Sequence, residues 1–388
     1  MGKKLTVLAA SELILGMEDG DPFTPFHAVK DMFNEADLVF AHLEHMHTKR
    51  PMVQGAHVAP PPSFENIEAL EYAHFDAVVL AGNPTYMSGA PGVEDTIKWL
   101  DDHGIGHVGA GMNIDEARKP LILEREGVKF GFLAVNCLGG ETAANLRKPG
   151  AAYVDIITYY NAPQFPGARA QGLTFIEPHS LEALKEDIRA LRPQCDVLTV
   201  VLHKGMGLTD EVILADYEYE LPRHCINEGA DLIISNHAHL LKAMEFYKGV
   251  PIYHCIGNLV TVFPYYVHRM FMQEPQTTLN RSKLRPRSGY NLSWMNLDAP
   301  NFPFPDAGRK SMIGKIVVDA ETKKIVQVGF HPIYIDRDGH PIPVGKSALG
   351  QKVFDYMVKV TEGAYGNAKF KWDGDEVIAY QDGEPLYT

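Results

Sequence analysis

The sequence predicts a mixed α and β fold, in which strands build sheets and helices cover them. Short apolar runs bounded by polar turn residues alternate along the chain with segments whose apolar residues recur every three or four positions. The length of 388 residues allows either two average domains or one large domain with insertions. No apolar run reaches the roughly 18 residues that span a bilayer, so we expect a soluble protein.

Composition excludes several classes of partner. The net charge of −13 argues against nucleic acid or an anionic membrane, because both need a basic surface. The four cysteines are far apart and include no C-x-x-C pair, which argues against a disulfide framework and a cysteine zinc site. The first apolar run is interrupted by Ser11, Glu12 and Glu18, and no cleavage site follows. We expect a cytoplasmic protein with no nucleic-acid or membrane partner, and a homo-oligomer is allowed.

The first half of the chain alternates between strands and helices. Ser63 precedes one apolar helical pattern and is the predicted N-cap. The turn Glu126-Gly127 separates two apolar runs and predicts a hairpin. Strands are predicted over 5–10, 37–43, 76–80, 107–109, 121–124 and 128–135, and helices over 27–35, 63–73 and 93–103.

The second half continues the alternation. A helix over 221–228 would hold Pro222 in its first turn, where the missing N–H has no cost, and would end at Gly229. The segments 136–176 and 263–310 are too long for plain connections, and we interpret the second as a lid or wall over a site. The other predicted elements are helices over 180–191 and 347–361, strands over 196–202, 232–235, 311–319 and 325–335, and a hairpin over 370–380.

Polar residues of ligand type follow the carboxyl ends of several predicted strands. This is where ligands and metals gather in sheets of α and β proteins. His237 and His239 form an H-x-H pair after one strand, and neutral imidazole is a common ligand of transition metals. Each residue alone could be a solvated loop residue, but their shared place predicts a metal or catalytic site. The set is Glu12, Glu44, Asn83, His203, His237 and His239.

Several of these residues lie in recognisable short motifs. The motifs are HLE at 42–44, LAGN at 80–83, LHKG at 202–205, EGADLIISNHAH at 228–239 and GVPIYHCIGN at 249–258. In order and spacing they resemble the CapA-type (capsule synthesis, poly-γ-glutamate) family of the calcineurin-like metallophosphoesterase superfamily.

The resemblance covers about residues 1–335 and implies a fold and a cofactor. The fold would be α+β, a four-layer αββα sandwich of two mixed β-sheets flanked by helices. Residues 263–310 would form an inserted lid or wall, and residues 336–388 a C-terminal helix and hairpin packed on the same domain. The implied cofactor is one or two divalent metal ions, and donor sets of N and O atoms allow Zn, Mn, Fe or Co.

The resemblance also implies a ligand set. Glu44 would bridge two metals; one metal would be held by Asn83, His203 and His237, and the other by Glu12 and His239. Two ions about 4 Å apart would share and activate a water. The chain departs from the family text at four positions: Glu12 replaces the Asp of GD, His42 the Asn of NLE, Pro84 the His of ANNH, and Lys204 the Trp of HWG.

Other residues are candidates for catalysis and substrate binding. His42, His45 and His47 lie beside Glu44, and His45 or His47, which share a face of an extended backbone, could replace the histidine missing at Pro84 as ligand or acid, although a solvated loop is the alternative. Lys204 could hold a substrate carboxylate or an oxyanion, unless it is a surface residue. Arg269 and Arg287 could bind an anionic substrate, because guanidinium groups fit carboxylates, and Tyr265 could line the pocket.

Three functions remain open. The first is a metal-dependent hydrolase that cleaves a carbon-nitrogen bond (amide, lactam or γ-glutamyl) of a small carboxylated substrate. The second is a metallophosphoesterase, which shares the fold. The third is a non-catalytic protein of poly-γ-glutamate synthesis or binding. Fold cannot choose among them, but a phosphoesterase would hydrolyse a generic aryl phosphate ester and an amide hydrolase would not.

Overall fold

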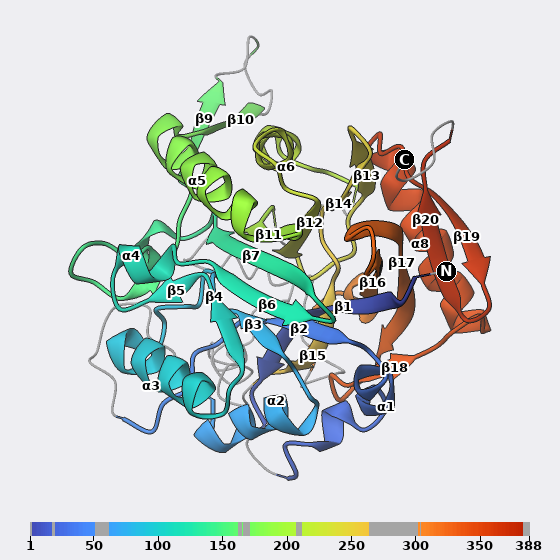
Figure 1. The fold of residues 1–388 in the computed structure, drawn as a ribbon, viewed down its shortest axis with the longest axis horizontal. Coiled ribbons are helices and arrows are strands. Elements are labelled where there is room, and N and C mark those ends of the chain that lie inside the picture. The colour runs from blue at the N-terminus through green and yellow to red at the C-terminus, as the bar shows by residue number, and fades with distance from the viewer. Residues whose placement is uncertain are drawn as a thin grey trace.

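In the computed structural model, two large β-sheets stack face to face and helices cover both outer surfaces (Figure 1). The structure describes residues 2–17, 20–50, 62–161, 165, 171–206, 212–263, 302 and 304–382. Among them, no helix combines the length and apolar character that crossing a bilayer requires.

The first sheet is mixed. Its strands β1 to β4 are parallel to one another, and β15 is parallel to β1, whereas β16 to β20 pair antiparallel. The main path runs β19-β20-β17-β16-β1-β2-β3-β4, with β15 beside β1 and β18 beside β17. The strands are β1 (Lys4–Leu15), β2 (Leu38–Leu43), β3 (Ala77–Val79), β4 (Gly106–Val108), β15 (Asn258–Val262), β16 (Lys310–Asp319), β17 (Lys324–Ile335), β18 (Pro341–Pro343), β19 (Lys369–Asp373) and β20 (Glu376–Tyr380).

The second sheet is also mixed, with the order β13-β14-β12-β11-β7-β6. Its four inner strands are parallel, and its two edge strands are antiparallel to their neighbours. The strands are β6 (Leu121–Arg125), β7 (Val128–Asn136), β11 (Val197–Lys204), β12 (Leu232–His237), β13 (Met244–Tyr247) and β14 (Val250–Tyr253). Two small ladders stand apart, β5 (Ala110–Gly111) with β8 (Gly150–Ala151), and β9 (Ile156–Asn161) with β10 (Gln171–Ile176).

Three apolar clusters separate four layers. One lies between the sheets, where Phe40 of β2 and Phe132 of β7 pack with ring centroids 5.1 Å apart. A second joins the outer face of the first sheet to α1 (Lys30–Asn34), α2 (Ala69–Tyr72) and α3 (Gly89–Asp102). The third joins the outer face of the second sheet to α4 (Ile114–Ala117), α5 (Pro178–Leu191) and α6 (Asp216–Asn227). The predicted αββα sandwich of two mixed sheets is therefore confirmed.

The C-terminal segment lies on the same body. β20 pairs with β17, and α8 (Ala348–Gly363) contributes Val353, Met357 and Val360 to the cluster between the sheets. This is the placement expected for a packed extension, although the predicted boundary at residue 335 stays a prediction.

Two local predictions were wrong. Helix α6 begins at Asp216, because Glu218 accepts a hydrogen bond from the Ala215 N–H at 2.9 Å and closes the first turn early. Pro222 is therefore inside the helix, where its ring removes the N–H that would bond the carbonyl four residues earlier. Ser63 does not cap a helix, since its hydroxyl donates to Glu65 at 2.6 Å, and the predicted single helix is divided into a 3-10 turn (Phe64–Glu68) and α2.

Candidate metal centre

The predicted site residues gather in the space between the two sheets, where parallel strands of both sheets end. Side chains alternate between the two faces of a strand. On the inner face, the next position after Phe40 of β2 toward the carboxyl end is His42, and the next position after Val201 of β11 is His203. Both imidazoles are therefore directed from opposite sheets into one polar space, and both are buried.

Glu12 lies at the centre of this space. It is fully buried on β1 and lies opposite His42 of β2 and Asn258 of β15. The pairing register shifts between Ala9 and Glu12, and a bulge of this kind bends a strand and redirects its side chains. Glu12 Oε1 accepts a hydrogen bond from the backbone N–H of His237 at 2.6 Å, which ties the end of β12 to β1.

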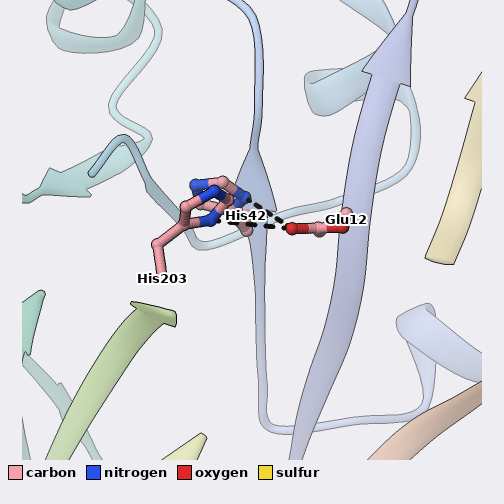
Figure 2. A group of neighbouring side chains, drawn as sticks. All are labelled: Glu12, His42 and His203. Carbon is pink, nitrogen blue, oxygen red and sulfur yellow. Dashed lines mark ion pairs between the residues drawn. The ribbon is translucent and has the colours of Figure 1, made fainter. Parts of the chain in front are cut away.

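His42 and His203 present the same ring atom to Glu12 (Figure 2). His42 Nδ1 is 3.7 Å and His203 Nδ1 is 3.6 Å from Glu12 Oε1. The Nε2 of His42 is 3.1 Å from the Ala81 carbonyl, so this nitrogen carries the proton in the neutral ring. His203 Nε2 is 2.8 Å from Asn83 Oδ1, which assigns the same tautomer to His203. Both Nδ1 lone pairs therefore face a carboxylate with no proton between them.

His239 contacts both carboxylates. Its Nδ1 is 2.8 Å from Glu12 Oε2, and its Nε2 is 3.5 Å from Glu44 Oε1. Burial opposes the charge on His239, but Glu12 and Glu44 raise its pKa well above the usual value. Burial raises the pKa of Glu12 to about 6, whereas for Glu44 the neighbouring His239 outweighs burial and lowers the pKa to about 2.

The other imidazoles are neutral at pH 7. Burial lowers the pKa of His42 to about 4 and that of His237 to about 3, and it lowers the pKa of His203 well below the usual value. A neutral imidazole offers a lone pair to a metal, whereas a protonated one cannot.

The backbone is strained where β12 delivers the H-x-H pair. His237 has φ 103° and His239 has φ 53°, a region that non-glycine residues seldom adopt. His237 contributes its backbone N–H to Glu12, while the rings of His203 and His237 have centroids 4.9 Å apart. The predicted ligands of this pair are thus both at the cluster.

Asn258 is a site residue that the sequence analysis missed. It is fully buried, its Oδ1 is 2.8 Å from His239 Nδ1, and its Nδ2 donates to the carbonyls of His239 and Gly308 at 3.0 and 3.2 Å. The available signal was a lone polar side chain at the start of the apolar strand β15, in the last position of the motif GVPIYHCIGN.

Lys204 is not brought to the cluster. It follows His203 on β11 and is directed to the opposite face of the sheet, where it is fully buried. Its Nζ is 3.3 Å from Glu218 Oε2 on α6 and 3.3 Å from His254 Nδ1. Glu245 continues this network from His254 (3.7 Å) to the surface residue Arg223 (3.1 Å).

The remaining candidates divide into two groups. His45 lies near Glu44 and His239, and burial lowers its pKa, whereas His47 is turned toward the Ser63 carbonyl at 3.1 Å. Phe304 stacks on His239 at 4.0 Å and contacts Phe263, whose ring centroid is 6.4 Å from that of His45. Arg269, Tyr265 and Arg287, together with most of the predicted lid over 263–310, lie outside the described residues.

The residues of the cluster fit a metal ion. Among the described residues, His42 Nδ1, His203 Nδ1, His237 Nδ1 and Glu44 Oε2 are buried without a hydrogen-bond partner. Two groups have their ligand atoms within 4.8 Å of one another, Glu12 with His42 and His203, and Glu12 with Glu44 and His239. A cation would satisfy these lone pairs, which otherwise lose hydration without compensation. Glu12 is common to both groups, whereas the resemblance gave the bridging role to Glu44.

A four-layer fold with carboxylate and imidazole donors at the strand ends between its sheets defines a metallophosphoesterase-like protein with a candidate metal site. Within this class, the chain belongs to the family of the bacterial capsule synthesis protein PGA_cap, whose model matches residues 7–262, well over half of the chain.

Curated relatives agree with this family. The chain is 25% identical over 239 residues to the PGA biosynthesis protein CapA of Bacillus subtilis, covering 61% of this chain and 56% of the relative. It is 24% identical over 200 residues to the capsule biosynthesis protein CapA of Bacillus anthracis, covering 50% and 42%. The aligned part thus spans about half the length of these two relatives.

Solved structures are more distant. A hypothetical protein of Thermus thermophilus superposes with a TM-score of 0.44 and 13% identity, covering 85% of this chain and 98% of the other. The NAD nucleotidase of Haemophilus influenzae superposes with a TM-score of 0.38 and 10% identity, covering 92% and 56%.

Proposed function

We propose that the protein is a metal-dependent hydrolase that cleaves a carbon-nitrogen bond of a small carboxylated substrate, such as an amide, a lactam or a γ-glutamyl bond. The observation that carries the metal dependence is the pair of Nδ1 lone pairs of His42 and His203, which face the buried Glu12 carboxylate with no proton between them. Two acceptors and a carboxylate in a buried space require a cation or protons for compensation.

The metal would be held by Glu12, His42, His203, Glu44 and His239, with His237 beside them, and His239 would release its proton as the metal binds. When bound, a divalent ion of this donor set polarises a substrate carbonyl and lowers the pKa of a water. We include one or two ions of Zn, Mn, Fe or Co in the proposal, because the donors are N and O atoms without thiolate.

Residues around the holders fix the orientation of the imidazoles. The Ala81 carbonyl accepts a hydrogen bond from the Nε2–H of His42, and Asn83 Oδ1 accepts one from the Nε2–H of His203. Asn258 Oδ1 contacts His239, while its amide group is held by two backbone carbonyls. Such partners set which nitrogen of each ring carries a lone pair. Asn83 acts in this proposal by orienting His203, and the predicted role of Asn83 as a ligand stays a prediction.

His45 is the candidate for proton transfer. Burial keeps it neutral at pH 7, and its Nδ1 is buried without a hydrogen-bond partner, so this atom can take up a proton and return it to the leaving amine. Phe304 and Phe263 cover His239 and His45 on one side, which excludes water from the carboxylates.

The carbon-nitrogen bond is supported by two arguments. The relatives are described as PGA and capsule biosynthesis proteins, and the repeating bond of poly-γ-glutamate is an amide. In addition, the family histidine after Asn83 is Pro84 here, and a pyrrolidine ring can neither accept nor donate a proton. The shared fold makes a phosphate ester the second candidate. The four cysteines are free, which accords with action in the cytoplasm as part of this proposal.

The metal is tested by plasma mass spectrometry of the purified protein. We expect about one or two equivalents of Zn, Mn or Fe in the wild type and a loss of most of it in His203→Ala. His179→Ala removes an exposed histidine on α5 and should retain the wild-type content. Less than about a tenth of an equivalent that added metal does not restore would leave a non-catalytic binding protein.

The bond is tested by hydrolysis assays on the metal-loaded protein. We expect release of amine from γ-glutamyl amides or lactams and no hydrolysis of an aryl phosphate ester, with loss of the activity in His203→Ala. Hydrolysis of the aryl ester alone would replace the proposal by a phosphoesterase.

A further inference from the structure

The small hairpin of β9 and β10 projects from the body of the protein beyond α5 (Figure 1). Its outer strand is almost entirely exposed, and three of its exposed side chains are large and apolar. Ile157, Tyr159 and Tyr160 are 47%, 57% and 72% exposed, and Phe175 on β10 is 51% exposed. Tyr159 lies opposite Leu173, and Ile157 lies opposite Phe175, so these side chains share one face of the hairpin.

The two strands of this hairpin have different surroundings. Strand β10 lies on α6, where the Thr174 N–H donates to Asp216 and the Tyr217 N–H donates to Thr174 Oγ1, both at 3.2 Å. Strand β9 lies on the other side, and within the described ranges its sole strand partner is β10. The outer edge of β9 therefore carries backbone N–H and C=O groups that no described strand pairs with.

Proteins usually protect such an edge. Charged side chains, proline and bulges prevent an exposed strand from pairing with another chain. The sequence of β9, IITYYN, contains no charged residue and no proline, and its ladder with β10 runs without a register shift. This uncharged edge belongs to a chain with a net charge of −13, and its pairing would bring no like charges of the edge together.

The order of residues in β9 is complementary to itself. In an antiparallel pair centred on Thr158, Thr158 of one copy lies opposite Thr158 of the other. Ile157 then lies opposite Tyr159, and Ile156 opposite Tyr160, so each β-branched residue meets an aromatic one. Threonine pairs and aromatic pairs with β-branched residues are among the stabilising cross-strand pairs.

We propose that β9 is a homodimerisation edge, which pairs antiparallel with β9 of a second copy of this chain about a two-fold axis at Thr158. The two hairpins then form one four-stranded sheet, and the interface is isologous. Because one short strand from each copy makes the contact, the buried area falls in the range of weak complexes, and the dimer depends on protein concentration.

The first test is sedimentation of the full chain over about a hundred-fold range of concentration, since the dimer population follows concentration. We expect the wild type to shift from monomer to dimer, and Thr158→Lys and Thr158→Glu each to remain monomeric, because like charges directly opposite one another are destabilising. An equimolar mixture of these two variants should dimerise again, which shows that both are folded. Leu146→Lys adds the same charge at another exposed apolar position and should behave as the wild type.

The second test fixes the register. A cysteine at Thr158 lies opposite its own copy, where Cα atoms about 4.5–5.5 Å apart permit a disulfide. A cysteine at Tyr160 is displaced from its copy by four residues, or about 13 Å, and should not crosslink. Of the native cysteines, three are buried and Cys195 is half-buried, which keeps the background low. A monomeric wild type at every concentration, dimerisation of Thr158→Lys, or equal crosslinking of both variants would overturn the proposal.

Discussion

His42 and His203 come from different β-sheets, yet their ring centroids are 4.5 Å apart and both direct Nδ1 at the same oxygen of Glu12. Each ring is fixed by a partner at Nε2, a backbone carbonyl for His42 and a side-chain amide for His203. The position of the candidate metal site therefore depends on the spacing of the two sheets as well as on the residues themselves. The predictions below test the parts of this arrangement separately.

Gly82 has no room for a side chain beside His42. A Cβ atom at this position would be 3.0 Å from both Cε1 and Nε2 of the His42 ring. We expect Gly82→Ala to displace the ring from the Ala81 carbonyl and to weaken metal affinity by about 10- to 100-fold, the usual cost of losing an orienting contact. Competition with a chromophoric chelator measures this affinity. Gly172→Ala is the matched control, because a Cβ there would meet no atom within 4 Å.

Asn258 supports the backbone around the H-x-H pair. Replacement by alanine leaves the carbonyls of His239 and Gly308 without their donor in a buried place. Unsatisfied buried groups cost about 1–3 kcal/mol each, so Asn258→Ala should lower the free energy of unfolding by about 2–5 kcal/mol even in chelator. Urea denaturation measures this free energy of unfolding. Asn227→Ala, at an exposed position, is the control and should change the free energy of unfolding by less than about 0.5 kcal/mol. An equal effect of both variants would contradict the role of Asn258.

Removal of metal should destabilise the fold, since the donors come from both sheets. Binding at about 100 times Kd stabilises a native state by about 2.7 kcal/mol, which corresponds to a decrease in Tm of roughly 3 °C after chelation for a chain of this size. Differential scanning fluorimetry with and without chelator measures it. The Tm should recover on addition of metal, and His203→Ala should show no response to chelator.

Lys204 should matter for stability, because its charge is buried with that of Glu218 at 3.3 Å. Removing one partner of a buried ion pair leaves the other uncompensated and costs about 3–5 kcal/mol. We expect this loss for Lys204→Met at pH 7 in denaturant unfolding. The double variant Lys204→Met with Glu218→Gln should lose less than the sum of the single variants.

The difference in stability between the wild type and Lys204→Met should depend on pH. Burial raises the pKa of Glu218, but Lys204 and the Ala215 N–H outweigh burial, so the pKa is lowered. A carboxyl with a lowered pKa contributes stability above its unfolded pKa of about 4.3, and this contribution is lost as pH falls through the folded value. The stability gap between wild type and Lys204→Met should therefore be largest near pH 7 and should narrow below about pH 4.3. A gap that widens in acid would contradict the ion pair.

Alternation along strands explains why much of the site could be predicted. Glu12, Glu44, Asn83, His203, His237 and His239 each follow an apolar run, and the ends of parallel strands converge in space. The same rule separates His203 from Lys204, although they are adjacent in sequence, and it could have placed Lys204 on the helix-covered face. The prediction of Lys204 as a catalytic residue used the loop position and not the strand face.

Other features depend on contacts that sequence patterns do not encode. The positive φ values of His237 and His239 arise where β12 is held by Glu12 across the sheets, and no local residue preference indicates them. The early start of α6 depends on the Glu218 side chain, which also serves Lys204. Asn258 was missed because its partners, His239 and Gly308, are distant in the chain.

The bond between Glu12 and the His237 N–H joins residues 225 positions apart. Contacts of such long separation form late, because the intervening chain must be ordered first. During synthesis on the ribosome, the first strand of the protein must therefore wait for β12 and β15 before its buried carboxylate can be compensated. Loading with metal would then report that the whole sandwich has assembled, and a truncated or stalled chain would carry Glu12 without the groups that match its charge.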